Sequence, residues 1–159
     1  MRKLILAVAL FVVSSTAAPS AARADIGIGI FLFEPTGLDI KLGLGPRTGL
    51  DIVLGISDIR GDESYGHVTY LVTPFVARGS GVLVPFRIGI GAAVFGVAEN
   101  NVGVALRVPF ELGFRFRSVD LEIYFEIAPR IVFVGDNGDN NRDNVFFDLD
   151  AGFGLRFYF

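Results

Sequence analysis

The sequence predicts an all-β fold: an eight-stranded antiparallel up-and-down β-barrel that spans a membrane and is preceded by a cleavable signal peptide. Three observations predict it. Apolar residues alternate with small or charged residues in one segment after another. Turn-forming residues separate these segments, and no segment has the period of an amphipathic helix. Residues 1–24 have the layout of an export signal.

The expected signal peptide begins with two basic residues and continues with a ten-residue apolar run, Leu4–Val13. Small residues follow and end in an A-x-A pattern, so cleavage is expected between Ala24 and Asp25. The alternative is a buried N-terminal helix. Under the signal interpretation, residues 1–24 are removed and residues 25–159 form a single outer-membrane barrel domain.

Composition excludes several classes of function. The full sequence has 14 basic and 17 acidic residues, and removal of the signal takes away three of the basic ones, leaving a net charge of about −6. Such a charge argues against binding to nucleic acid. Cysteine is absent, so neither disulfides nor thiolate metal sites can form. No apolar run reaches the roughly 18–20 residues that a membrane-spanning helix requires.

Eight strands are expected where the alternation with period two is sustained. The clearest is the last, in which every second residue from Val145 to Phe159 is apolar. The expected strands are Asp25–Phe33, Thr36–Gly45, Thr48–Ser57, His67–Ala77, Val82–Val97, Val102–Arg117, Val119–Val134 and Val145–Phe159.

Two features predict irregular strands. Proline removes a backbone donor from the sheet, so bulges or kinks are expected at Pro85, Pro109 and Pro129. The segment His67–Ala77 alternates least cleanly. Its outward-facing residues are expected to be Val68, Tyr70, Val72, Pro74 and Val76.

The connections alternate in length. Tight turns follow the second, fourth and sixth strands, whereas polar loops, Ile59–Gly66 and Gly135–Asn144, follow the third and seventh. Short turns at one rim and longer loops at the other are typical of membrane barrels, and an even number of strands places both ends of the domain at the short-turn rim. Asp39 and Asp51, which occupy equivalent positions in a short repeat, are expected near opposite ends of the barrel.

The apolar faces decide between two kinds of barrel. A soluble barrel would turn them inward around a ligand, but the interior of eight strands is too narrow for so many Phe, Ile and Leu side chains. The opposite faces carry glycine and charged residues, which suit a narrow interior. Seven acidic and seven basic residues are expected to form a closed, ion-paired plug there: Asp39, Asp51, Glu111, Glu122, Glu126, Asp148 and Asp150 with Lys41, Arg87, Arg107, Arg115, Arg117, Arg130 and Arg156.

The signal peptide, the alternating strands and the terminal GFGLRFYF resemble a small OmpA/OmpX-type outer-membrane β-barrel of Gram-negative bacteria. The resemblance covers all of residues 25–159. It implies location in the outer membrane, contact with outer-membrane lipid, and insertion by the outer-membrane assembly machinery. It also implies that the last strand carries the assembly signal, at Phe153, Leu155, Phe157, Tyr158 and Phe159.

The single histidine, His67, is a candidate catalytic residue. Some small outer-membrane barrels are lipid A deacylases that use His-x-Ser on one strand, and the corresponding triplet here is His67-Val68-Thr69. Threonine replaces the nucleophile and no acid can be assigned to orient the histidine. His67 is therefore expected to be a residue of the rim, near an extracellular loop.

The acidic loop Gly135–Asn144 could bind Ca²⁺ through its oxygens, but it lacks the EF-hand spacing and is expected to be a solvated turn. No metal and no cofactor are therefore expected.

The sequence favours a monomeric, non-enzymatic barrel in envelope structure or surface interaction, with an unidentified extracellular ligand. The alternatives are an enzyme that modifies lipid A, an acyl hydrolase or transferase, and a narrow pore for small solutes.

Overall fold

The computed structural model describes residues 25–57, 63–97, 102–134 and 145–159. The expected signal peptide and the expected loop Gly135–Asn144 lie outside the described residues. In the part of the chain that is described, no helix is long and apolar enough to cross a membrane.

The described residues form a single antiparallel sheet, which runs through the strands in nearly sequential order. The strands are β1 (Ile26–Glu34), β2 (Thr36–Gly45), β3 (Thr48–Ser57), β4 (Glu63–Arg78), β5 (Val82–Phe95), β6 (Gly103–Arg107), β7 (Phe110–Phe116), β8 (Leu121–Val134) and β9 (Val145–Tyr158).

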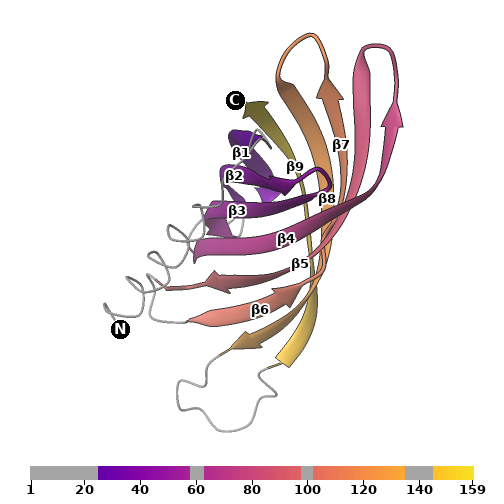
Figure 1. Cartoon of the computed structure of the whole chain (residues 1–159). Helices are drawn as coiled ribbons and strands as arrows, with labels where there is room; N and C mark the ends of the chain where they lie inside the picture. Colours follow the sequence, from indigo (N-terminus) through magenta and orange to yellow (C-terminus); the bar gives the residue numbers. More distant parts are fainter. Residues whose placement is uncertain (1–24, 58–62, 98–101, 135–144) are drawn as a thin grey trace, which may run out of the picture.

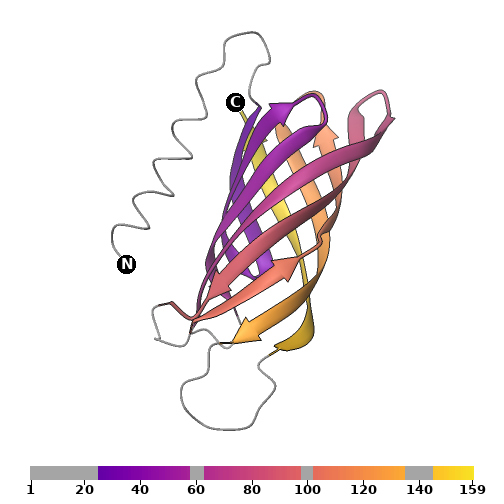
Figure 2. The same cartoon turned by 60° about the horizontal axis from the view of Figure 1, so that its bottom comes forward.

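The sheet closes on itself into a ring (Figures 1 and 2). Strand β1 pairs with β2 on one side and with β9 on the other, and β4 pairs with β5. Strands β6 and β7 share one position between β5 and β8, so the ring has eight strands. Every described strand therefore has a neighbour on both sides, which satisfies the backbone groups that an open edge would expose. The predicted all-β, antiparallel ring of eight strands is confirmed.

Pro109 divides the sixth predicted strand into β6 and β7. The break keeps its backbone hydrogen bonds: Gly89 N–H donates to the carbonyl of Pro109 at 3.0 Å, and Val108 N–H donates to the carbonyl of Pro129 at 2.9 Å. No bulge occurs at Pro85 or Pro129, since the registers of β5 and β8 run through these residues without a shift. The irregularity at Pro85 is instead an interruption, since the pairing of β5 with β7 stops at Leu83 and resumes at Phe86. Pro129 is tolerated because it lies beside the break, where β8 has no continuous neighbour.

A bulge that was not predicted lies in β4. The pairing of β4 with β5 shifts between Val72 and Phe75, around Pro74. One extra residue reverses which residues face outward, so Phe75 is exposed and Val76 lines the inner side. The predicted outward position of Val76 was therefore wrong. Strand β4 also begins at Glu63, so residues 63–66 belong to a strand and not to the expected loop.

The other strand bounds follow the prediction closely. Strands β2 and β3 begin and end where the alternation does. Strand β5 ends at Phe95 instead of Val97, and β8 begins at Leu121 instead of Val119. The turns that follow β2, β4 and β7 lie at one end of the ring, together with Asp25 and Phe159 (Figure 2). This end is named the turn end below, and the other the loop end.

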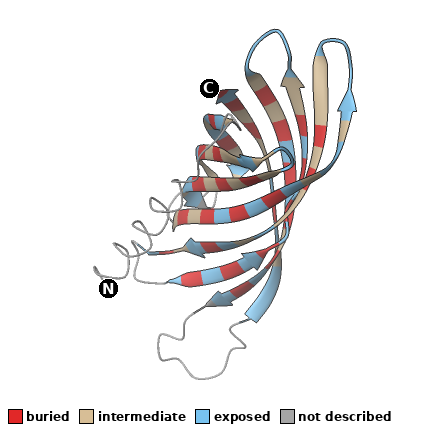
Figure 3. Ribbon diagram, viewed as in Figure 1, coloured by how far each residue is buried: buried red, intermediate tan, exposed pale blue. Residues whose placement is uncertain are grey.

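Exposed and buried residues alternate along the strands (Figure 3). On β9, Phe147, Leu149 and Phe157 are exposed, whereas Asp150 and Arg156 are buried. The apolar face therefore lies outside the ring and the charged face inside it.

Candidate functional site: the charged interior of the ring

Arg156 is the centre of the interior. It projects from β9, is fully buried, and contacts four carboxylates on four other strands. Its Nε lies 2.6 Å from Asp39 Oδ2 and its Nη2 lies 2.6 Å from Asp51 Oδ1. Its Nη1 lies 3.1 Å from Glu111 Oε2 and 3.5 Å from Glu122 Oε1. One guanidinium thus joins β9 to β2, β3, β7 and β8.

Tyr124 completes this central layer. Its hydroxyl donates to Asp39 Oδ2 at 2.6 Å, and the guanidinium of Arg156 lies over its ring, 3.7 Å from the centroid. The ring fits because Gly154, its neighbour on β9, has no side chain: a Cβ there would lie 2.1 Å from Tyr124 Cε1. The inward glycines therefore make room for large inward side chains, as the sequence indicates.

The layer nearer the turn end is organised around Arg87. Its guanidinium donates to Glu111 and, through both terminal nitrogens, to the carboxylate of Glu122 at 2.8 Å. Lys41 Nζ lies 3.5 Å from Glu111 Oε1. The hydroxyl of Tyr158 donates to Glu122 at 3.1 Å.

The layer nearer the loop end contains two arginines. Arg107 pairs with Glu126 and also donates to Thr69 Oγ1 at 3.4 Å. Arg130 Nη1 lies 2.9 Å from Asp150 Oδ1, and its Nη2 lies 2.5 Å from Asp148 Oδ2.

The structure places eleven of the predicted interior charges in buried positions: Asp39, Lys41, Asp51, Arg87, Arg107, Glu111, Glu122, Glu126, Arg130, Asp150 and Arg156. These eleven residues are named the interior charge network below. Arg115 and Asp148 are partly exposed, at opposite ends of the ring. Arg117 was predicted to face inward but is exposed, because β7 ends at Phe116. Of the seven acidic and seven basic residues predicted to face the interior, seven acidic and six basic ones therefore do so.

Asp39 and Asp51 lie close together, not at opposite ends as predicted. The tight turn after Gly45 sets a register in which Lys41 pairs with Asp51 and Asp39 pairs with Val53. The two carboxylates are therefore offset by only two residues, and both reach Arg156. The repeat spans two strands joined by a turn so short that equivalent positions stay at nearly the same depth in the ring.

His67 is buried inside the ring, not at the rim. It is 2% exposed, its Nδ1 lies 3.3 Å from the hydroxyl of Tyr65, and its Nε2 lies 3.8 Å from Asp51 Oδ2. Thr69 is buried on the same face. Strand β4 extends several residues beyond its expected start, which moves His67 away from the loop end.

Three buried carboxylates lie close enough to share a metal ion, since oxygens of Asp51, Glu111 and Glu126 are within 4.8 Å of one another. Each already pairs with an arginine, Asp51 with Arg156, Glu111 with Arg87 and Glu126 with Arg107. A divalent cation would have to displace these guanidinium groups. The donor set therefore fits ion pairing better than metal binding.

The sequence analysis assigns no role to the tyrosines of the interior. Tyr65, Tyr124 and Tyr158 are buried, and each donates a hydrogen bond to a carboxylate of the interior charge network. The available signal was their position on the glycine-rich faces. A buried phenol needs a partner for its hydroxyl, and buried carboxylates supply one.

The predicted assembly-signal residues lie at the turn end of β9, and Phe159 directly follows the last residue of this strand, Tyr158. Phe157 and Phe159 are exposed, Phe153 and Leu155 are half-buried, and Tyr158 is buried inside.

Comparison with family models, curated proteins and solved structures finds no match for this chain. The functional proposal therefore depends on the geometry described above.

Proposed function

We propose that this chain is a monomeric, non-enzymatic β-barrel of a bacterial outer membrane, exported by cleavage between Ala24 and Asp25. Its ion-paired interior acts as a rigid plug. Its role is envelope structure or surface interaction, through the predicted polar loops at residues 59–62 and 135–144, which lie outside the described residues. The OmpA/OmpX-type resemblance agrees with this proposal.

The inverted distribution of polarity is the observation that carries the proposal. Large apolar side chains cover the outside of the ring, including Ile90 at 65% exposed, Phe75 at 62% and Phe147 at 71%. Monomeric soluble proteins rarely expose apolar patches of more than a few hundred Å². Here the fully buried residues instead include Arg107, Arg156 and Glu111. Lipid around the ring would cover the apolar outer face, while the charged inner face stays buried and ion-paired.

The strand lengths fit a bilayer. Strands β2 and β3 have 10 residues each, within the roughly 9–11 residues that a tilted strand needs to span the hydrocarbon core. Strands β8 and β9 have 14 residues each, which at about 3.3 Å per residue and a tilt of about 40° reach roughly 35 Å. Ring closure also satisfies the backbone, as lipid requires.

The interior charge network supports a plug over a pore. In the central layer, Arg156 and Tyr124 occupy the space between β2, β3 and β8 with direct contacts. Planar-bilayer recordings with purified protein test this reading. We expect no steady channels. Steady channels of large conductance would contradict a closed interior.

The enzyme alternative requires a histidine that can reach an outer-leaflet lipid. His67 and Thr69 instead face the interior and are 2% and 0% exposed. We expect His67→Ala to leave the acylation of lipid A unchanged. A change in acylation in cells that express this variant would restore the enzyme interpretation.

The proposed location is tested by fractionation and gel mobility. We expect the protein in the outer-membrane fraction, with a mobility on SDS gels that shifts on boiling. Recovery as a soluble periplasmic protein, without such a shift, would overturn the proposal. Insertion by the outer-membrane assembly machinery would depend on the apolar turn end of β9.

A further inference from the structure

The turn end of the ring contains a cavity that the charge network does not fill. Its volume is about 350 Å³, and it is lined by residues of β2, β3, β4, β5, β7 and β9 and of the β2–β3 turn. Three glycines, Gly43, Gly45 and Gly49, contribute no side chain to it. The size is that of a small-ligand site.

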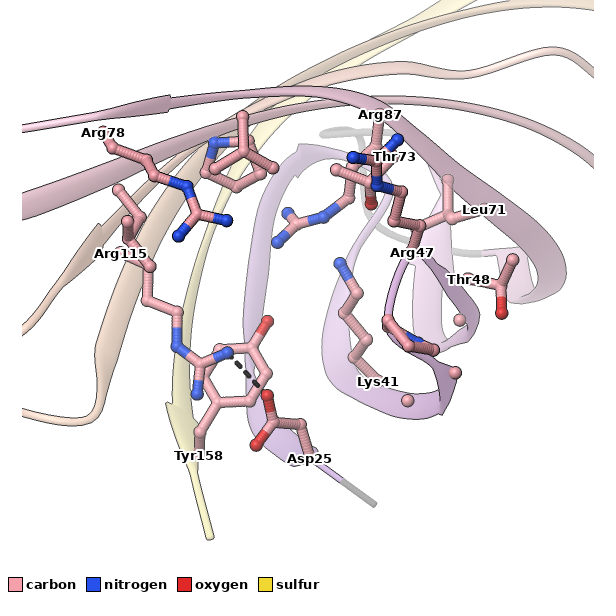
Figure 4. A pocket seen from close by; sticks show the side chains of 17 residues that line it. Asp25, Lys41, Arg47, Thr48, Leu71, Thr73, Arg78, Arg87, Arg115 and Tyr158 are labelled. Carbon is pink, nitrogen blue, oxygen red and sulfur yellow. Dashed lines mark hydrogen bonds and ion pairs between the residues drawn. The ribbon is translucent and has the colours of Figure 1, made fainter. Parts of the chain in front are cut away.

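The lining of this cavity is strongly basic. Five cationic side chains contribute to it, and the single acidic residue among the lining residues is Asp25. Figure 4 shows Lys41 and Arg78 extending toward the same hollow, with the ion pair of Arg115 and Asp25 on one side. The five cations are Lys41, Arg47, Arg78, Arg87 and Arg115.

Partners inside the protein compensate only part of this charge. Arg115 Nη1 lies 2.8 Å from Asp25 Oδ2. Lys41 pairs with Glu111, and Arg87 pairs with both Glu111 and Glu122. Within the described residues, Arg47 and Arg78 have no carboxylate partner. Two of the five lining cations, Arg47 and Arg78, are therefore without a carboxylate of their own.

Lys41 gives a second, independent indication of a ligand. It is 7% exposed, and its Nζ has no hydrogen-bond partner although the ammonium group has three donors. Its one carboxylate neighbour is the ion-pair contact at 3.5 Å with Glu111. A buried donor that lines a basic cavity without an acceptor favours occupation by an anion.

The bulge in β4 builds this site. Before the shift between Val72 and Phe75, odd-numbered residues of β4 face inward, and after it even-numbered residues do. The shift therefore places Val76 and Arg78 on the lining of the cavity. Without it, Arg78 would face outward.

We propose that this cavity is a binding site for a phosphate dianion, either inorganic phosphate or a phosphate monoester. Guanidinium groups match phosphate oxygens with paired donors, and a monoester carries about −1.5 to −2 charges at neutral pH, which matches the two arginines without a carboxylate. A carboxylate has a single negative charge and would neutralise only one of them. The site does not depend on the location proposed above. A lipid as the source of the phosphate does depend on that location, because the turn end would then face the periplasmic leaflet.

The test is calorimetric titration of the folded protein, extracted in detergent, with sodium phosphate and separately with a short-chain phosphatidic acid. Sodium chloride at equal ionic strength is the control. Binding of phosphate identifies the free anion as sufficient, and binding of the phosphatidic acid alone identifies a lipid-borne monoester. No saturable heat with either, or the same heat with chloride, overturns the site.

Matched arginine variants test the residues. We expect Arg47→Gln and Arg78→Gln each to weaken binding roughly tenfold, and the double variant about a hundredfold. Arg117→Gln is the control, because Arg117 is exposed near the turn end but does not line the cavity. All three arginines are exposed, so the variants should keep the gel shift of the folded protein. If Arg117→Gln weakened phosphate binding equally, the effect would come from general surface charge, and the site would be contradicted.

Discussion

Replacement of Arg156 by methionine should destabilise the ring strongly. The side chain bridges Asp39, Asp51, Glu111 and Glu122. Arg87 continues to neutralise the two glutamates after the change, so Asp39 and Asp51 are the carboxylates that lose their cation. Methionine keeps most of the buried volume, which separates the loss of charge from the creation of a cavity.

The expected size of the effect follows from these contacts. Removal of one partner from a buried ion pair costs about 3–5 kcal/mol, because the remaining charge stays buried. Two orphaned carboxylates place Arg156→Met at the upper part of this range, even though Tyr124 still donates to Asp39. A second variant that adds Asp39→Asn and Asp51→Asn removes both orphaned charges. It should recover at least about 2 kcal/mol of the loss.

The assay is equilibrium unfolding in urea of the detergent-extracted protein. Tryptophan is absent, so the folded fraction is read from gel mobility and far-ultraviolet circular dichroism. Arg117→Met is the control and should change the free energy of unfolding by less than about 0.5 kcal/mol, because the side chain is exposed. A loss below about 1 kcal/mol for Arg156→Met, or no recovery in the triple variant, would refute the central role of Arg156.

Two further predictions concern the two faces of the strands. Gly154→Ala should lower the free energy of unfolding by about 1–3 kcal/mol, because the added Cβ would lie 2.1 Å from the ring of Tyr124. Gly81→Ala, where a Cβ meets nothing within 4 Å, should be nearly neutral, and equal effects in urea unfolding would contradict the packing described for Tyr124. Ile90 lies near the middle of β5, so Ile90→Arg should cost about 2–4 kcal/mol of folding free energy in lipid vesicles, as expected for an arginine near the bilayer midplane. A neutral result would mean that water, not lipid, covers Ile90.

The sequence predicts the ring well because its signals are local. Strands β2 and β3 follow from alternation between recognisable turns, and the tight turn after Gly45 leaves little freedom in their bounds. The inward or outward direction of each residue follows from the same period as long as no bulge intervenes. This explains why most of the predicted interior charges, Arg156 among them, are buried in the structure.

The remaining features depend on distances across the ring. Which carboxylates meet Arg156 is set by the relative register of five strands, and no single strand carries that information. The bulge in β4 shows a second limit, because one extra residue reverses the facing of Val76 and Arg78. The error for His67 has the same kind of origin, since an early start of β4 changes its depth in the ring.

The most direct test of the membrane proposal uses the absence of cysteine from the chain. Ile90→Cys places a single thiol on a side chain that is 65% exposed on the outside of the ring. Arg117→Cys places one near the turn end as a control. In isolated outer membranes, a water-soluble maleimide should label the cysteine at position 117 and leave the one at position 90 unlabelled until the protein is unfolded. Rapid labelling at position 90 in the folded protein would show that water reaches the apolar face, and would contradict its contact with lipid.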